Sequence, residues 1–411
     1  MSVESPPAPA GPPRWRQLAV IFGARTTINT AHRIIYPFLP ALARGLGISL
    51  AAAGGLVTAR LVAGLAAPLI GPWTDRHPRR RTMEIALAVF SVGGLLLVGA
   101  APGYGGLAAA IAAFVLYGLA KVVYDPAVHA YLGDTVPYDR RGRAVGIIEL
   151  SWSAAWLLGV PATGFLMERY GWRVPWGVLA GLGLVALGLT RLGLTAVRPP
   201  QQAGGGGPPL RALFNRWREL LGRRRTAALL LTSLLLTMGM EVPFIVYGAW
   251  LESSFGLSLS SLGLASIAVG LAETTAELGT TLLTDRLGKR RAVLMGLGGM
   301  AASLLLLPSL AGQGLAGALG GVVLFVLTFE FAIVSLIPLA TEVAPQARAS
   351  LLSLNLLAFS LGRMAGAATG GWLWTWGGER ITWPAVAGAA CALAAALVVY
   401  RGMAEISPGG G

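Results

Sequence analysis

Long runs of apolar residues recur along nearly the whole chain and are separated by short polar connections. Each run holds about 20 residues, the length that a helix needs to cross a hydrocarbon core about 30 Å thick. Backbone polar groups in lipid need internal partners, so the runs are predicted to be helices, because barrel strands need only about 10 alternating residues. The pattern predicts twelve spans, at about residues 17–40, 50–72, 83–101, 106–131, 144–168, 174–196, 226–252, 261–284, 291–310, 315–341, 349–375 and 381–401.

The longest connection, residues 197–225, divides the spans into two groups of six. It begins with a Gly- and Pro-rich stretch, residues 201–209, of a composition typical of flexible linkers. Apolar residues at helical spacing among many Arg then predict an amphipathic helix from Leu210 to Arg225, either on the inner membrane surface or as an ordinary cytoplasmic connector. The predicted units are a disordered cytoplasmic tail (1–16), an N-terminal bundle (17–196), this linker, a C-terminal bundle (226–402) and a C-terminal tail (403–411).

The two groups of spans repeat one another. The segment from Asp75 to Arg81 matches the segment from Asp285 to Arg291 at an offset of 210 residues, and residues 46–50 match 255–259 at 209. Pro137 and Arg140 match Pro345 and Arg348 at 208. Near-equal offsets predict two six-helix bundles of the same construction, the arrangement of transporters that bind substrate between repeats. The predicted fold is therefore an all-α membrane protein of two pseudo-symmetric bundles.

Composition and charge agree with a polytopic membrane protein. Only 12% of the 411 residues are charged, against about 25% in soluble domains. The net charge of +14 does not indicate nucleic-acid binding, because the basic residues form short clusters between the apolar runs. With both termini in the cytoplasm, 23 Lys and Arg fall on the cytoplasmic side and 4 outside, which predicts a multi-pass protein of the cytoplasmic (inner) membrane. The single cysteine, Cys391, predicts neither a disulfide framework nor a cysteine metal site.

A basic motif follows the second predicted span and recurs after the eighth. Its first copy, Gly71-Pro-Trp-Thr-Asp-Arg-His-Pro-Arg-Arg-Arg81, resembles the cytoplasmic signature of the major facilitator superfamily, Gly-x-x-x-Asp-Arg-x-Gly-Arg-(Arg/Lys), although Pro78 replaces the second Gly. The resemblance implies that Asp75 and Asp285 lock an inner gate, each beside a helix N-terminus of the other half, where partial positive charge stabilises a carboxylate. The alternative is a solvated loop that only sets topology. The implied gate residues are Gly71, Asp75, Arg76, Arg80, Asp285, Arg286 and Arg290.

The fifth predicted span contains Gly159-Val-Pro-Ala-Thr-Gly164, which resembles the Gly- and Pro-rich helix 5 motif of the drug:proton antiporter branch. The resemblance implies close packing and a bend at Gly159, Pro161 and Gly164, since Pro removes one backbone hydrogen bond. Antiporters of this branch usually carry an Arg ahead of a Gly in helix 4. Here no Arg precedes Gly118, and Lys121 and Asp125 lie one turn further on.

Ionisable residues inside the predicted spans are the main candidates for a functional site, because charge within the bilayer is costly and usually functional. The N-terminal half is mostly basic there and the C-terminal half is mostly acidic. Predicted substrate-binding residues are Arg25, Asn29, Arg33, Tyr36, Arg60, Lys121, Tyr124, Trp156 and Arg363. Predicted proton carriers are Asp125, Glu149, Glu241 and Glu330, since burial disfavours a charged carboxylate. Structural ion pairs are the alternative for each of them, as they are for Glu273 and Glu277.

These features predict a secondary transporter that works by alternating access and exports a small amphiphilic molecule or drug in exchange for protons. The alternatives are a facilitator or symporter of an anionic metabolite, a flippase of an anionic lipid, or a membrane sensor that does not transport. No phosphate-binding Gly-Lys-Ser/Thr loop and no catalytic or metal constellation occurs in the sequence, so neither an enzyme nor a cofactor is expected. The expected partners are a small-molecule substrate, protons and the lipid bilayer, and the protein is expected to be a monomer.

Overall fold

The computed structural model describes residues 15–65, 77–196, 210–343 and 348–403, and this part of the chain is helical, without strands. The N-terminal half comprises α1 (Trp15–Arg33), α2 (Ile35–Leu46), α3 (Leu50–Leu65), α5 (Arg79–Gly99), α6 (Tyr104–Thr135), α7 (Tyr138–Glu149), α8 (Ser151–Ala154), a π-helical turn (Ala155–Gly159), α9 (Val160–Tyr170) and α10 (Val174–Gly193). The C-terminal half comprises α12 (Arg224–Phe244), α13 (Tyr247–Phe255), α14 (Leu259–Leu287), α15 (Lys289–Ala311), α16 (Leu315–Val343), α17 (Arg348–Trp376) and α18 (Thr382–Gly402).

The helices match the twelve predicted membrane spans, of which the second is only partly described. Within the described ranges, ten helices are long and apolar enough by themselves to cross a membrane. The first span is broken at Ile34 into α1 and α2, yet it continues through backbone hydrogen bonds from Ile34 to Thr30 and from Phe38 to Ile34. The second span begins with α3, which runs at 118° to α2 and therefore leads back across the membrane. Polar side chains such as Arg25 and Asn29 make α1 too hydrophilic to be recognised by apolarity alone.

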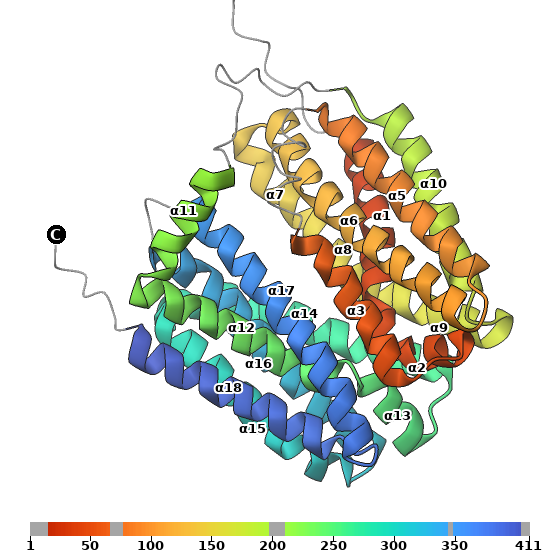
Figure 1. The fold of residues 1–411 in the computed structure, drawn as a ribbon. Coiled ribbons are helices and arrows are strands. Elements are labelled where there is room, and N and C mark those ends of the chain that lie inside the picture. Colours follow the sequence, from red (N-terminus) through yellow and green to blue (C-terminus); the bar gives the residue numbers. More distant parts are fainter. Residues whose placement is uncertain (1–14, 66–76, 197–209, 344–347, 404–411) are drawn as a thin grey trace, which may run out of the picture.

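The spans divide into two six-helix bundles, one for each half of the chain. Figure 1 shows the N-terminal bundle, in red to yellow-green, beside the C-terminal bundle, in green to blue. The two bundles pack against each other through α2 with α13, α3 with α17, and α9 with α14. The prediction of an all-α fold with two pseudo-symmetric bundles is confirmed. Between the halves, a helix, α11 (Leu210–Leu221), precedes α12; its location on the membrane surface stays a prediction.

An equivalent contact in each half illustrates the repeat. Arg80, near the start of α5, donates to the carbonyl oxygen of Leu194 at 3.1 Å, where α10 ends. Arg290, 210 residues later at the start of α15, donates to the carbonyl oxygen of Tyr400 at 2.8 Å, near the end of α18. The last carbonyls of a helix lack partners within that helix and carry partial negative charge, so a guanidinium stabilises them. The third and ninth spans thus hold the ends of the sixth and twelfth in the same way.

The fifth span is irregular where its sequence contains the Gly and Pro residues. The helix continues from α7 into α9 but widens into a π-helical turn at Ala155–Gly159, immediately before Pro161. A proline in a helix lacks an N–H group and clashes with the carbonyl four residues earlier, and a widened turn accommodates both defects. The irregularity at this motif is a π-helical turn, and the bend that the resemblance implies stays a prediction.

Close contact between the bundles requires glycine at specific positions. A Cβ atom on Gly164 would lie 2.4 Å from the carbonyl oxygen of Leu259, at the start of α14. One on Gly248 would lie 2.3 Å from the carbonyl oxygen of Pro37 in α2. Both distances are far below van der Waals contact, so any larger residue would force the backbones apart. Small residues allow this kind of backbone approach between membrane helices.

Candidate functional site

The polar face of α1 is the centre of a buried charge cluster. Arg25 is almost fully buried and its guanidinium pairs with Asp125 of α6 at 3.2 Å and with Glu149, at the end of α7, at 2.9 Å. The same side chain donates to the carbonyl oxygen of Ile148 at 3.1 Å. A buried cation with two carboxylate partners is well compensated for its lost hydration. Arg25, a predicted substrate-binding residue, is therefore occupied by protein groups in this conformation.

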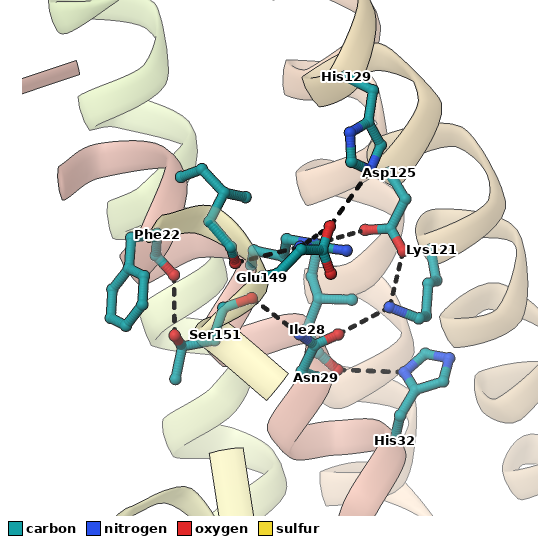
Figure 2. Close-up of polar contacts among 12 residues, drawn as sticks. Phe22, Ile28, Asn29, His32, Lys121, Asp125, His129, Glu149 and Ser151 are labelled. Atoms are coloured by element: carbon teal, nitrogen blue, oxygen red, sulfur yellow. Dashed lines mark hydrogen bonds and ion pairs between the residues drawn. The ribbon is translucent and has the colours of Figure 1, made fainter. Parts of the chain in front are cut away.

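Lys121 connects α1 to the same cluster. Its ammonium group lies 2.8 Å from Asp125, one turn along α6, and 2.7 Å from the side-chain oxygen of Asn29. Asn29 in turn donates to the hydroxyl of Ser151 in α8 at 3.1 Å. Figure 2 shows Lys121 directed toward both Asn29 and Asp125, with Glu149 and His129 on the other side of Asp125. Three spans that are distant in sequence, the first, the fourth and the fifth, thus share one hydrogen-bonded network.

A second pair joins the two bundles. Arg33, at the end of α1, lies 2.8 Å from Glu273 of α14. The Arg33 guanidinium also lies 4.6 Å from the centre of the Trp152 ring and 4.9 Å from that of Trp156, which is a cation–π arrangement. The side chain of Glu273 is 5% exposed, and its second carboxylate oxygen has no hydrogen-bond partner within the described residues. The pair is therefore buried between the halves and incompletely satisfied.

The remaining predicted cations are Arg60 and Arg363. Arg60 of α3 donates to the carbonyl oxygen of His32 at 2.7 Å and to the hydroxyl of Tyr36 at 3.2 Å. In the C-terminal half, Arg363 of α17 lies 3.7 Å from the buried carboxylate of Glu241. The 3.7 Å separation is longer than a hydrogen bond, so Glu241 is only electrostatically compensated there.

Aromatic rings pack beside these charges. Phe244 of α12 lies 4.9 Å from Tyr36, 6.2 Å from Trp156 and 4.9 Å from Tyr247, measured between ring centres. The cluster draws rings from both halves, and it lies next to Arg33 and Arg60 through Trp156 and Tyr36. The site thus combines charged groups with an aromatic wall, which suits an amphiphilic ligand.

Two other predicted residues lie apart from the ion pairs. Tyr124 is fully buried in α6, and its hydroxyl has no hydrogen-bond partner in the part of the chain that the structure describes. Glu330 of α16 is half-buried, and among the described residues no ion pair involves it. Their predicted roles, in substrate binding and in proton transfer, stay predictions.

Solvent exposure decreases along the site. The side chains of His129 and Glu149 are 44% and 41% exposed, that of Asp125 is 22% exposed, and that of Glu241 is fully buried. His129 lies toward Thr135, where α6 ends on the side predicted to be cytoplasmic. The two halves are also joined at the opposite side, where Arg44 pairs with Glu252 at 2.8 Å and Glu168 accepts a hydrogen bond from the backbone N–H of Ser260 at 2.7 Å. The charged side chains of the site are therefore most exposed on the side predicted to be cytoplasmic.

The gate motif is only partly visible. Gly71, Asp75 and Arg76 fall outside the described residues, as does the side chain of Asp285. Arg286 is exposed near the end of α14. Arg80 and Arg290 bind the ends of their own bundles, as described above. The predicted locking of the halves by Asp75 and Asp285 stays a prediction.

The helix 5 motif has a clear packing role. Gly159 faces α1, where an added Cβ would lie 2.1 Å from the hydroxyl oxygen of Thr30. Pro161 and Gly164 face α14, since a Cβ on Gly263 would lie 3.0 Å from the Cα atom of Pro161. The motif thus allows the fifth span to pack closely against two partners. One is the first span, and the other is α14 of the C-terminal bundle.

Glu273 and Trp152 contact the predicted cations but were not selected from the sequence. Glu273 was identified as an ionisable residue within a span but not as a proton carrier, because spacing within one helix cannot reveal a partner 240 residues away. Trp152 contacts both Arg33 and Lys121, with the Lys121 nitrogen 4.0 Å from its ring centre. Its position one turn before Trp156 on the fifth span was the only available signal.

Comparison with known proteins now gives the family. The family model described as the Major Facilitator Superfamily matches residues 21–247 and 229–407, nearly the whole chain. This chain belongs to the major facilitator superfamily. It is a multi-pass membrane transporter of that superfamily, and not an enzyme. The more specific resemblance to the drug:proton antiporter branch stays a hypothesis.

Two relatives and one solved structure illustrate how similar this chain is to other transporters. The MFS-type transporter YceJ of Bacillus subtilis (strain 168) is 26% identical over 366 residues, which are 88% of each chain. The lysophospholipid transporter LplT of Enterobacter sp. (strain 638) is 31% identical over 274 residues, 62% of this chain and 65% of LplT. The solved structure of a D-xylose–proton symporter superposes with a TM-score of 0.72 at 18% identity, covering 95% of this chain and 98% of the symporter, which supports the fold alone.

Proposed function

We propose that this major facilitator superfamily member is a secondary transporter that exports a small amphiphilic molecule across the cytoplasmic membrane in exchange for protons. The observation that carries the proposal is the buried ion pair between Arg33 and Glu273, which joins the two bundles next to an aromatic wall. The pair offers a binding group to each ligand. The Glu273 carboxylate can be protonated, and the aromatic rings beside it can bind the apolar part of a substrate.

The exchange follows from competition at this pair. A proton on Glu273 removes its negative charge and thereby weakens the attraction to Arg33 across the bundle interface. A cationic substrate would compete with Arg33 for the same carboxylate. Each ligand then shifts the inward–outward equilibrium only to the extent that it binds the two states with different affinity. Protonation and substrate binding at one carboxylate are mutually exclusive, which is what antiport requires.

The cluster around Asp125 supports the same scheme. Asp125 balances Arg25 and Lys121, and its side chain is partly exposed on the side predicted to be cytoplasmic. Proton release from a carboxylate needs a path to water, and Asp125 lies on such a path between exposed Glu149 and buried Asn29. We infer that Asp125 exchanges protons with the cytoplasm, whereas Glu273 responds to substrate.

A second candidate function is transport of an anionic amphiphile, such as a lysophospholipid. The arrangement of Arg33 favours it, since a guanidinium in contact with two indole rings can bind a phosphate or carboxylate while the rings contact an apolar chain. The relative LplT is a lysophospholipid transporter. In this case the substrate anion would replace Glu273 as the partner of Arg33.

A flux assay distinguishes the two. Purified protein in proteoliposomes containing a pH-sensitive dye is given a proton gradient and then lipophilic cations, organic anions, lysophospholipids or sugars, one class at a time. Proton movement driven by lipophilic cations, and lost in Glu273→Gln but kept in Glu219→Gln, supports antiport. Glu219 is the matched control because it pairs with Arg223 on the exposed surface of α11. Uptake of labelled lysophospholipid that is lost in Arg33→Ala, without proton movement, supports the second candidate, and flux of neither class contradicts both.

A further inference from the structure

A cavity of about 560 Å³ lies at the predicted cytoplasmic end of the N-terminal bundle, away from the transport site. It is formed where α5 begins and α10 ends, and it is lined by Pro78, Arg80, Arg81, Glu84, Arg191 and Ala196. Three guanidinium groups and one carboxylate therefore surround it. The transport proposal makes no use of these groups.

Only one of the three arginines in this cavity has a carboxylate partner among the described residues. Arg80 pairs with Glu84 at 3.2 Å and also donates to the carbonyl oxygen of Leu194. Arg81 and Arg191 are exposed, and no carboxylate among the described residues pairs with either of them. After the single acid has been balanced, the cavity keeps two guanidinium groups for an external anion. A guanidinium presents paired N–H donors that match the geometry of phosphate oxygens.

The apolar surface beside the cavity indicates the source of the anion. Ile85 and Val92 follow Arg81 at intervals of four and eleven residues on α5, which places them on the same helical face, and both are exposed. Leu184 precedes Arg191 by seven residues on α10 and is also exposed. In a membrane span, exposed apolar side chains of this kind contact lipid tails. The basic cavity therefore continues toward the bilayer centre as two adjoining apolar strips.

We propose that this cavity binds the phosphate headgroup of an anionic phospholipid of the inner leaflet, with Arg81 and Arg191 as its main donors and the acyl chains along α5 and α10. Basic pockets between membrane helices on the cytoplasmic side are suited to anionic headgroups. A soluble phosphate would use the arginines but gain nothing from the apolar strips. An anionic lipid uses both features and bridges the third and sixth spans at their ends.

The test measures lipid binding directly, so it does not depend on any transport activity. The full chain in a neutral detergent receives phosphatidylglycerol or phosphatidylcholine with identical acyl chains, and bound lipid is measured by native mass spectrometry. The double change Arg81→Gln with Arg191→Gln is expected to weaken phosphatidylglycerol binding about 30-fold, the effect of two surface arginines. Arg81→Lys with Arg191→Lys keeps the charge but loses the paired donors, so it should weaken binding less than the double Gln change does. The matched control, Arg140→Gln with Arg143→Gln, removes two exposed cytoplasmic arginines elsewhere and should change nothing.

Several results would overturn the proposal. Equal binding of phosphatidylcholine would show that the headgroup charge is not recognised, and equal loss in the control variant would show only a general surface charge effect. Competition by free glycerol 3-phosphate at the concentration at which the lipid binds would assign the cavity to a soluble anion. If the double Gln variant does not fold, the single change Arg81→Gln is measured with the same control, and unchanged binding of phosphatidylglycerol contradicts the proposal.

Discussion

Arg33 and Glu273 lie 240 residues apart in the chain, yet their side chains meet at 2.8 Å between the two bundles. The Arg33 guanidinium also contacts the rings of Trp152 and Trp156. The two residues of the pair move with different bundles, so the pair responds to any rearrangement of one bundle against the other. In the proposed mechanism, the pair is therefore the point at which ligand binding and the motion of the bundles are most directly connected.

The stability of this pair can be measured by a double-mutant cycle. Arg33→Ala leaves the buried Glu273 carboxylate without a counter-charge, and we expect a loss of about 3 kcal/mol in the free energy of unfolding. Arg33→Ala combined with Glu273→Ala should recover most of that loss, because no unpaired charge remains. Thermal unfolding in detergent measures both effects. Additive losses in the double variant would mean that the two side chains do not interact in solution.

The two carboxylates that bind Arg25 are expected to differ in importance. Asp125→Asn deprives both Arg25 and Lys121 of their shared partner, so it should lower coupled flux by at least about tenfold, the effect of losing about 1.4 kcal/mol. Glu149→Gln should cost less than about threefold, since Glu149 is 41% exposed and Asp125 remains beside Arg25. Initial rates in proteoliposomes give the comparison. A larger effect of Glu149→Gln than of Asp125→Asn would contradict this order.

The sequence predicted much of this architecture because its physical signals are local. Apolar length defines the spans, and the repeat of Asp75 to Arg81 at Asp285 to Arg291 defines the two halves. The pairing of Lys121 with Asp125 is equally local, since residues four apart on a helix lie on one face. The pairing of Arg33 with Glu273 was out of reach, because it depends on how two bundles meet. The Gly and Pro residues of the fifth span indicate an irregular helix, but they do not specify that the irregularity is a π-helical turn.

The glycines at the bundle interface give a prediction about packing. Gly248→Leu places a side chain where even a Cβ atom would lie 2.3 Å from the carbonyl oxygen of Pro37. The backbones of α2 and α13 must then separate, and we expect a loss of about 2 kcal/mol or more in this conformation. Gly256→Leu is not a suitable control, because Gly256 has a positive φ of 64°. Gly181→Leu is suitable, since a Cβ atom on Gly181 meets nothing within 4 Å. Equal unfolding temperatures of the Gly248 and Gly181 variants would contradict the close approach.

The contacts on the predicted external side should hold the protein in the conformation described. Glu168 of the N-terminal bundle accepts from the backbone N–H of Ser260 at the start of α14, where a helix carries partial positive charge. Glu168→Gln removes the charge from this exposed contact, and we expect it to shift the equilibrium between the two states away from this conformation by up to about fivefold.

Cysteine labelling measures that shift. With Cys391 changed to Ala, a cysteine introduced at Glu277, which is exposed in this conformation, reports access from the predicted cytoplasm. Glu168→Gln should slow its modification by up to about fivefold if the exposed state becomes less populated. Glu219→Gln, which removes an exposed carboxylate on α11, should leave the rate unchanged and serves as the control. We expect slower labelling because access from the cytoplasm requires the two bundles to remain joined on the external side. Faster labelling in Glu168→Gln would mean that Glu168 instead stabilises the opposite state.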